Sequence, residues 1–117
     1  AYFIDNNQNA IACITENLEH THLTDKSVVL RQDAFSALCG SIKETTDIIF
    51  LDPPYNQEYD RRILELLQNA PFVNEDTLIV VEASVETSFD YAQTLGFVVE
   101  REKVYSKSKH VFIKKDE

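Results

Sequence analysis

The stretch Asp47-Ile48-Ile49-Phe50-Leu51-Asp52-Pro53-Pro54-Tyr55 decides the fold and most of the chemistry that can be read from this chain. Residues 48–51 are an uninterrupted apolar run, which is typical of a buried strand. Proline supplies no N–H to a β-ladder, so the pair at 53 and 54 ends that strand. We therefore predict a buried strand over residues 47–51, with a carboxylate, two prolines and an aromatic ring directly after it.

On both sides of this stretch, short β-type runs alternate with segments of helical periodicity, a pattern that predicts an α/β fold with a mainly parallel sheet. Residues 97–105 and 110–113 alternate with a period of two and are close enough to pair as an antiparallel hairpin. The chain has 117 residues, of which 44% are hydrophobic, so we expect one domain over residues 1–117. The other expected strands cover 2–4, 28–30 and 77–82, and the expected helices cover 7–21, 34–42, 63–67 and 85–95, the last ended by Gly96.

Asp52, Pro53, Pro54 and Tyr55 are residues suited to an exocyclic amine of a nucleobase. The lone pair of such an amine is delocalised into the base, and it becomes localised when a carboxylate and a carbonyl oxygen accept hydrogen bonds from both N–H groups. Asp52 and the carbonyl oxygen of Pro53 fit these roles, because the prolines fix φ and bring no competing N–H. Tyr55 would stack on an unstacked or single-stranded base. The alternative is that this motif only ends a strand and begins a turn.

Four stretches along nearly the whole chain carry a family resemblance: Ile4-Asp5 with Asn17-Leu18, Gln32-Asp33-Ala34, residues 47–55, and Ile79-Val80-Val81-Glu82 with Glu100-Arg101-Glu102-Lys103. In this order they resemble the class I, S-adenosylmethionine-dependent methyltransferases of the RsmD type, which methylate the guanine N2 amine of 16S ribosomal RNA. The resemblance implies a Rossmann-like class I methyltransferase sheet with a C-terminal antiparallel hairpin. It also implies S-adenosylmethionine as cofactor and ribosomal RNA, within a small-subunit particle, as partner.

The resemblance assigns cofactor contacts to Asp5, Asp33 and Ala34, which follow the first two expected strands. Asp5 would accept hydrogen bonds from both ribose hydroxyls, and Asp33 would accept from the adenine amine, with Ala34 packing nearby. Ligands of such sheets bind at the carboxyl ends of the strands, where both aspartates stand. Each aspartate has an alternative role as a helix N-cap, and the residues leave both roles open.

The start of the chain departs from the family pattern, because no glycine-rich turn precedes the strand at residues 2–4. In the family, a first strand and such a turn let the backbone approach the methionine part of the cofactor. Gly40 and Gly96 are the only glycines. We therefore expect the N-terminal part of the fold to be missing, and we expect this chain alone to bind the cofactor poorly or not at all.

Charge is distributed unevenly along the chain. The net charge of −9 is unusual for a protein that approaches phosphates. Residues 1–100 hold 5 basic and 17 acidic side chains, a net of −12, whereas residues 101–117 hold 6 basic and 3 acidic ones, a net of +3. The basic side chains could line one edge and contact RNA phosphates, or they could belong to a solvated hairpin with alternating charges. They are Arg101, Lys103, Lys107, Lys109, Lys114 and Lys115.

Membrane and metal functions receive no support from the sequence. No apolar run approaches the roughly 18–20 residues of a membrane span, and the start does not resemble a secretory signal. Cys13 and Cys39 form no CxxC pair, and the histidines have no metal-ligand spacing. We expect two buried free thiols, no metal, no catalytic histidine and a cytoplasmic location.

Two other functions stay open. An N6-adenine or N4-cytosine DNA methyltransferase can share Asp-Pro-Pro-Tyr, because it also methylates a conjugated amine, but its usual target-recognition region does not fit in 117 residues. The other is a non-catalytic α/β binding module that keeps the motif and lacks the cofactor loop.

Overall fold

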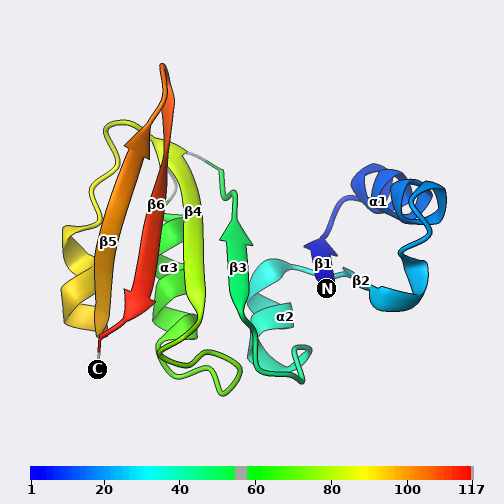
Figure 1. The fold of residues 1–117 in the computed structure, drawn as a ribbon, viewed down its shortest axis with the longest axis horizontal. Coiled ribbons are helices and arrows are strands. Elements are labelled where there is room, and N and C mark those ends of the chain that lie inside the picture. Colours follow the sequence, from blue (N-terminus) through cyan, green and yellow to red (C-terminus); the bar gives the residue numbers. More distant parts are fainter. Residues whose placement is uncertain (55–57, 117) are drawn as a thin grey trace. The chain divides into compact units, whose positions relative to one another are not determined.

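The computed structural model describes residues 1–54 and 58–116. The chain divides into two compact units, Ala1–Lys43 and Glu44–Glu117, and each is described by itself (Figure 1). That residues 1–117 form a single domain stays a prediction. Tyr55, which we predicted to stack on a base, lies outside the described residues.

The first unit is a pair of parallel strands with helices between and after them. Its elements are β1 (Tyr2–Asp5), α1 (Gln8–His20), the 3₁₀ helix η1 (Thr24–Lys26), β2 (Val28–Arg31) and α2 (Ala34–Gly40). Residues 2–5 pair in order with residues 28–31, so the carboxyl ends of both strands lie side by side. Leu18 and Ala37 are the buried apolar side chains of this unit.

The second unit is built around a four-stranded sheet in the order β3-β4-β6-β5 (Figure 1). Its elements are β3 (Ile48–Leu51), α3 (Tyr59–Leu67), β4 (Leu78–Ser84), the 3₁₀ helix η2 (Asp90–Leu95), β5 (Phe97–Val104) and β6 (Ser108–Lys115). β3 runs parallel to β4, whereas β6 is antiparallel to both of its neighbours. The predicted antiparallel hairpin at the end of the chain is therefore confirmed.

The core of the second unit lies between one face of this sheet and the helices. α3 lies behind the sheet in the view of Figure 1. Side chains alternate between faces along a strand, so every second residue of β4 and β6 reaches this core. Its largest side chains with almost no exposed surface are Leu64, Leu67, Ile79, Val81, Phe97, Val111 and Ile113.

The opposite face of the sheet, which we call the outer face, carries aromatic and ionisable side chains. Strand pairing places Phe50 beside Val80, Val80 beside Phe112, and Glu82 beside His110. Arg101 and Lys103 of β5 pair with Phe112 and His110, so they share this face. Phe50 is 59% exposed. The outer face is thus available to other molecules or other parts of the protein.

One expected helix differs in the structure. We predicted a helix over residues 85–95, but only Asp90–Leu95 is helical, and it is a 3₁₀ helix. The cause is hydroxyl bonding before it, which competes with a helical turn: the hydroxyls of Ser84 and Thr87 lie 2.7 Å apart, and the Ser88 hydroxyl accepts from the Asp90 N–H. Gly96 ends the helix with a φ of 80°, as predicted.

The structure bears on two further expectations, the state of the two cysteines and the membrane-spanning capacity of the helices. Cys13 and Cys39 are free thiols, as predicted, but both are exposed rather than buried, because they lie on the solvent-facing sides of α1 and α2. Within residues 1–54 and 58–116, none of the helices combines the length and the apolar character that a membrane crossing needs.

Candidate active site

Asp52 stands directly after β3, at the carboxyl end of the parallel pair in the second unit. Leu51 pairs with Val81, so the residues that follow them, Asp52 and Glu82, are neighbours across the two strands. Pro53 is half-buried and Pro54 is exposed. The predicted end of the strand at Leu51 is confirmed, but its predicted burial is wrong, because Ile48 and Phe50 are exposed on one face of the sheet. The amine-orienting roles of Asp52, Pro53 and Pro54 stay predictions.

The Asp52 carboxyl is held close to a second carboxyl group. Partial burial raises the pKa of Asp52, and a hydrogen bond with Glu82 and repulsion from its charge raise this pKa further. The positive charge of His110 acts in the opposite direction and lowers it. Asp52 therefore holds a proton more readily than an isolated aspartate does, which is useful for a group that must accept one during a reaction.

His110 joins this pair from β6. Its Nε2 lies 3.5 Å from Oε1 of Glu82, and its Nδ1 lies 3.1 Å from the hydroxyl of Tyr105. The Phe50 ring meets the imidazole edge-on, with ring centroids 5.9 Å apart. The sequence had no nucleophile or metal pattern around His110, and these contacts depend on strand register, which a sequence does not specify at this distance along the chain.

The candidate cofactor residues lie in the first unit. Asp5 and Asp33 follow the carboxyl ends of the adjacent parallel strands β1 and β2, and Ala34 is the first residue of α2. Asn7, not Asp5, is the N-cap of α1, and Asp5 Oδ1 instead accepts from the Asn7 N–H at 2.8 Å. The capping alternative for Asp5 is thus wrong.

Asp33 has the capping role that the sequence allowed. Its Oδ2 accepts from the Ser36 N–H at 3.3 Å, at the start of α2. A carboxylate has about four lone-pair sites, so neither aspartate is saturated by its bond to the backbone. Two carboxylates at adjacent strand ends suit the hydroxyl and amine donors of a nucleoside, and their cofactor roles stay predictions.

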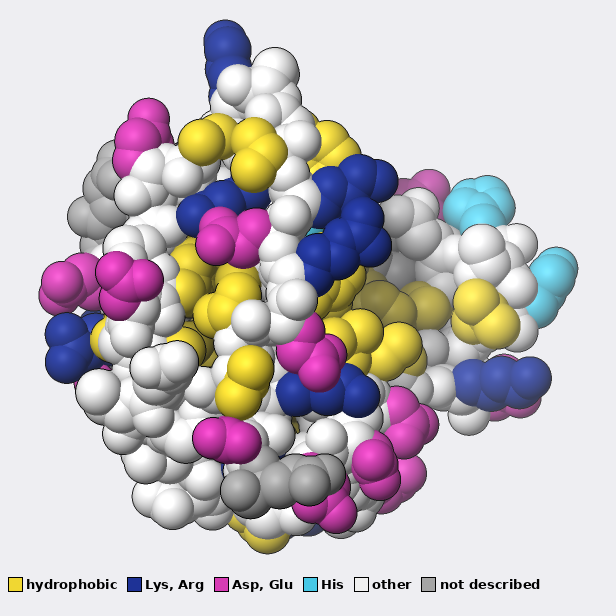
Figure 2. Space-filling view, turned by 60° about the vertical axis from the view of Figure 1, so that its left-hand side comes forward, with side chains coloured by type: hydrophobic (Ala, Val, Ile, Leu, Met, Phe, Trp, Pro, Cys, Tyr) yellow, Lys and Arg dark blue, Asp and Glu magenta, His cyan; other side chains and the backbone are white. Residues whose placement is uncertain are grey.

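The basic side chains of the last segment do not form a single strip. Lys109 is 6% exposed and pairs with Glu102 on the core side of the sheet, over the ring of Phe89. Lys115 Nζ donates to the backbone carbonyl of Val73. Of the two alternatives left open by the sequence, the one in which all six line one edge is therefore wrong, because strand alternation sends Lys109 to the core. Figure 2 shows basic and acidic side chains interspersed on this side of the molecule.

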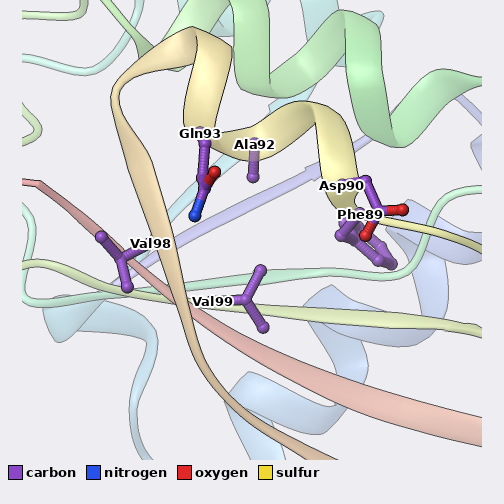
Figure 3. Close-up of a pocket in the computed structure, with 6 residues that line it drawn as sticks. All are labelled: Phe89, Asp90, Ala92, Gln93, Val98 and Val99. Atoms are coloured by element: carbon purple, nitrogen blue, oxygen red, sulfur yellow. The ribbon is translucent and has the colours of Figure 1, made fainter.

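A pocket of about 300 Å³ lies between η2 and β5. Figure 3 shows Ala92 and Gln93 pointing from the helix toward the strand that carries Val98 and Val99. Phe89 and Asp90 complete its lining. It shares no residue with the Asp52 group, and we assign it no part in the site.

Comparison with known proteins supplies the family. A family model described as "Conserved hypothetical protein 95" matches residues 1–114. The chain belongs to this family. The resemblance to RsmD-type enzymes, inferred from the sequence, is thereby confirmed.

Among its relatives, the chain is 34% identical over 106 residues to the "Putative rRNA methyltransferase YlbH" of Bacillus subtilis (strain 168). The match covers 88% of this chain and 56% of that protein, so the chain spans little more than half the length of this relative.

Solved structures share the fold. A conserved hypothetical protein of Streptococcus pyogenes superposes with a TM-score of 0.87 at 24% identity, over 99% of this chain and 71% of that one. TrmK of M. capricolum, in complex with the cofactor product S-adenosyl-homocysteine, has a TM-score of 0.72 at 17% identity, over 100% of this chain and 52% of that one. The predicted class I methyltransferase fold is thus confirmed.

Proposed function

We propose that the protein containing this chain transfers a methyl group from S-adenosylmethionine to an exocyclic base amine, the guanine N2 amine of 16S ribosomal RNA. The observation that carries the proposal is the place of Asp52, whose carboxyl group stands at the carboxyl end of β3 beside Glu82. Family membership and a relative named as a putative rRNA methyltransferase support it. The cytoplasm, where ribosomes are made, is the proposed location.

The residues of the motif act on the amine. Asp52 and the carbonyl oxygen of Pro53 accept hydrogen bonds from its two N–H groups, so the lone pair becomes localised on nitrogen. When bound, S-adenosylmethionine supplies the methyl group as an electrophile. The Asp52 carboxylate then accepts the proton that the methylated amine loses. Holding the amine in line supplies much of the acceleration. Tyr55, by the motif alone, stacks on the target base.

The cofactor is bound by Asp5, Asp33 and Ala34. The Asp5 carboxylate accepts from the ribose hydroxyls, and Asp33 accepts from the adenine amine beside Ala34. Both carboxylates follow adjacent parallel strands and keep acceptor capacity after their bonds to the backbone, which supports these roles.

The RNA contacts come from the outer face and the hairpin turn. Arg101 and Lys103 share the outer face with Glu82, and Lys107 is exposed in the turn between β5 and β6. These cations, on the far edge strand of the sheet and in its turn, would hold phosphates of the RNA that carries the target nucleotide. Because the whole chain is acidic, a net −9, we expect an assembled small-subunit particle to be a better substrate than naked RNA.

Transfer of labelled methyl from S-adenosylmethionine tests this function. The complete gene product and its Asp52→Ala variant would be offered unmethylated small ribosomal subunits, naked ribosomal RNA and duplex DNA. Label in RNA guanine that disappears in the variant supports the proposal. Label only in DNA would favour the adenine or cytosine alternative. No label in any substrate would favour a non-catalytic binding module.

A further inference from the structure

We propose that Glu82, His110 and Tyr105 form a relay that orients Asp52 and carries away the proton that this carboxylate takes from the substrate amine. Its catalytic part rests on the function proposed above. The three residues act through Asp52, so they are positioning residues. The motif at residues 52–55 does not include them, and the family resemblance assigned no role to any of the three, although Glu82 ends one of the stretches that carry it.

The strands themselves assemble the relay. Parallel pairing of β3 with β4 sets Asp52 beside Glu82, and antiparallel pairing of β4 with β6 sets Glu82 opposite His110. The imidazole then spans the gap between a carboxylate oxygen at 3.5 Å and the Tyr105 hydroxyl at 3.1 Å. The contacts come from three separate strands and the hairpin turn. Backbone pairing therefore brings these residues together, and their side-chain contacts orient them.

The proton balance follows from these contacts. The amine N–H bond breaks and an O–H bond forms on Asp52, which then passes the proton across its hydrogen bond to the Glu82 carboxylate. Glu82 passes it to Nε2 of His110, provided that Nδ1 carries the other ring proton and donates it to the Tyr105 hydroxyl oxygen. About a quarter of the His110 side chain is exposed, at 25%, so the imidazolium can release the proton to water.

Charged side chains lie around the imidazole of His110. Lys103 pairs with His110 across β5 and β6, and its Nζ lies 5.6 Å from the centre of the Tyr105 ring. Among the described residues, the other ionisable groups that face His110 are Glu82, Asp52 and Tyr105. Lys109 points to the core side and is paired with Glu102.

Glu82 and His110 also act on Asp52 in opposite directions, which makes the relay testable. The Glu82 carboxyl raises the pKa of Asp52, and the His110 charge lowers it. Removing the first partner should thus lower the pKa of Asp52, and removing the second should raise it. A purely structural role would not produce shifts of opposite sign.

The experiment follows the carboxyl carbon of Asp52 by NMR as a function of pH in the complete gene product, assigned by its loss in Asp52→Asn. We compare Glu82→Gln, which keeps the side-chain shape and removes the charge, with His110→Gln. Glu86→Gln and His22→Gln serve as controls, because both residues are exposed and outside the site. The expected result is a midpoint at lower pH in Glu82→Gln, at higher pH in His110→Gln, and unchanged in both controls.

Unchanged midpoints in both site variants, or shifts of the same sign, would overturn the relay. Backbone amide spectra of each variant establish that it is folded. The same proteins are then assayed for methyl transfer. The relay predicts that Glu82→Gln and Tyr105→Phe lower kcat and leave KM for RNA unchanged, and equal changes of both constants would contradict it.

Failure of the proposed function is distinguishable from failure of the relay. Opposite shifts of the Asp52 titration midpoint, without any methyl transfer by the wild-type protein, would support the orienting contacts and contradict the proposed methyltransferase function. Normal methyl transfer with unshifted midpoints would support the methyltransferase function and contradict the relay.

Discussion

The two compact units differ most in how much apolar side chain each buries. Among the described residues, the first unit buries Leu18 and Ala37, whereas the second buries fifteen apolar side chains on its sheet, its helices and the loops between them. The second unit also has four paired strands where the first has two. A pair of strands without an extensive core is marginal by itself.

This difference separates two parts of the proposed chemistry. Asp52 and its partners stand on the well-packed sheet, which suits a group that must orient a substrate amine closely. Asp5 and Asp33 stand on the first unit, which buries few apolar side chains. Four predictions test this contrast.

The largest effect is expected at Asp52. The change Asp52→Asn should lower kcat about 10²- to 10⁴-fold, because the amine loses its proton acceptor. The affinity for S-adenosylmethionine, measured by calorimetry, should stay within about twofold of the wild-type value. A substitution away from the cofactor contacts usually changes free energies by no more than about 0.5 kcal/mol. Asp47→Asn, an exposed aspartate at the other end of β3, is the control. Retention of near-normal turnover in Asp52→Asn would remove Asp52 from the mechanism.

The second prediction concerns the two cores. Leu64 is 0% exposed in α3, so Leu64→Ala should lower the free energy of unfolding by about 2–5 kcal/mol. Ile14 of α1 is half-buried, and Ile14→Ala should lower it by about 1 kcal/mol or less. Urea unfolding measures both. Equal losses would show that the first unit contributes as much packing as the second.

The third prediction concerns the cofactor carboxylates. Asp5→Asn should raise the dissociation constant for S-adenosylmethionine roughly 10- to 100-fold, because bonds to a charged acceptor are lost. Since Asp5 does not cap α1, circular dichroism should show unchanged helix content. Asp33→Asn keeps an N-cap and should weaken binding less than Asp33→Ala does. Unaltered affinity in Asp5→Asn would rule out the ribose contact.

The smallest effect is expected from the cations of the outer face. Replacing Lys103 by Gln should weaken RNA binding a few-fold and reduce the slope of log affinity against log salt by about one. Lys109→Gln should leave this slope unchanged and instead destabilise the fold, because Lys109 is buried with Glu102. Filter binding at several salt concentrations measures both. If the salt dependence fell only in Lys109→Gln, Lys109 rather than Lys103 would be the residue that contacts RNA phosphates.

Much of the fold could be predicted from the sequence, because local patterns carry it. The apolar run at residues 48–51 and the prolines after it define β3 and its end. The hairpin strands follow from a period of two, and Gly96 marks the end of η2. The helix expected over residues 85–95 was too long, because hydroxyl groups at 84, 87 and 88 bond locally instead.

The sequence by itself determined the class of fold, the family and the place of Asp52, because each of these rests on neighbouring residues and their spacing. The burial of Lys109 and the contact of Glu82 with His110 were decided only by the tertiary structure. Both depend on which residues of β4, β5 and β6 pair with one another. A shift of one residue in that register would send each side chain to the other face, and periodicity along one strand does not specify it.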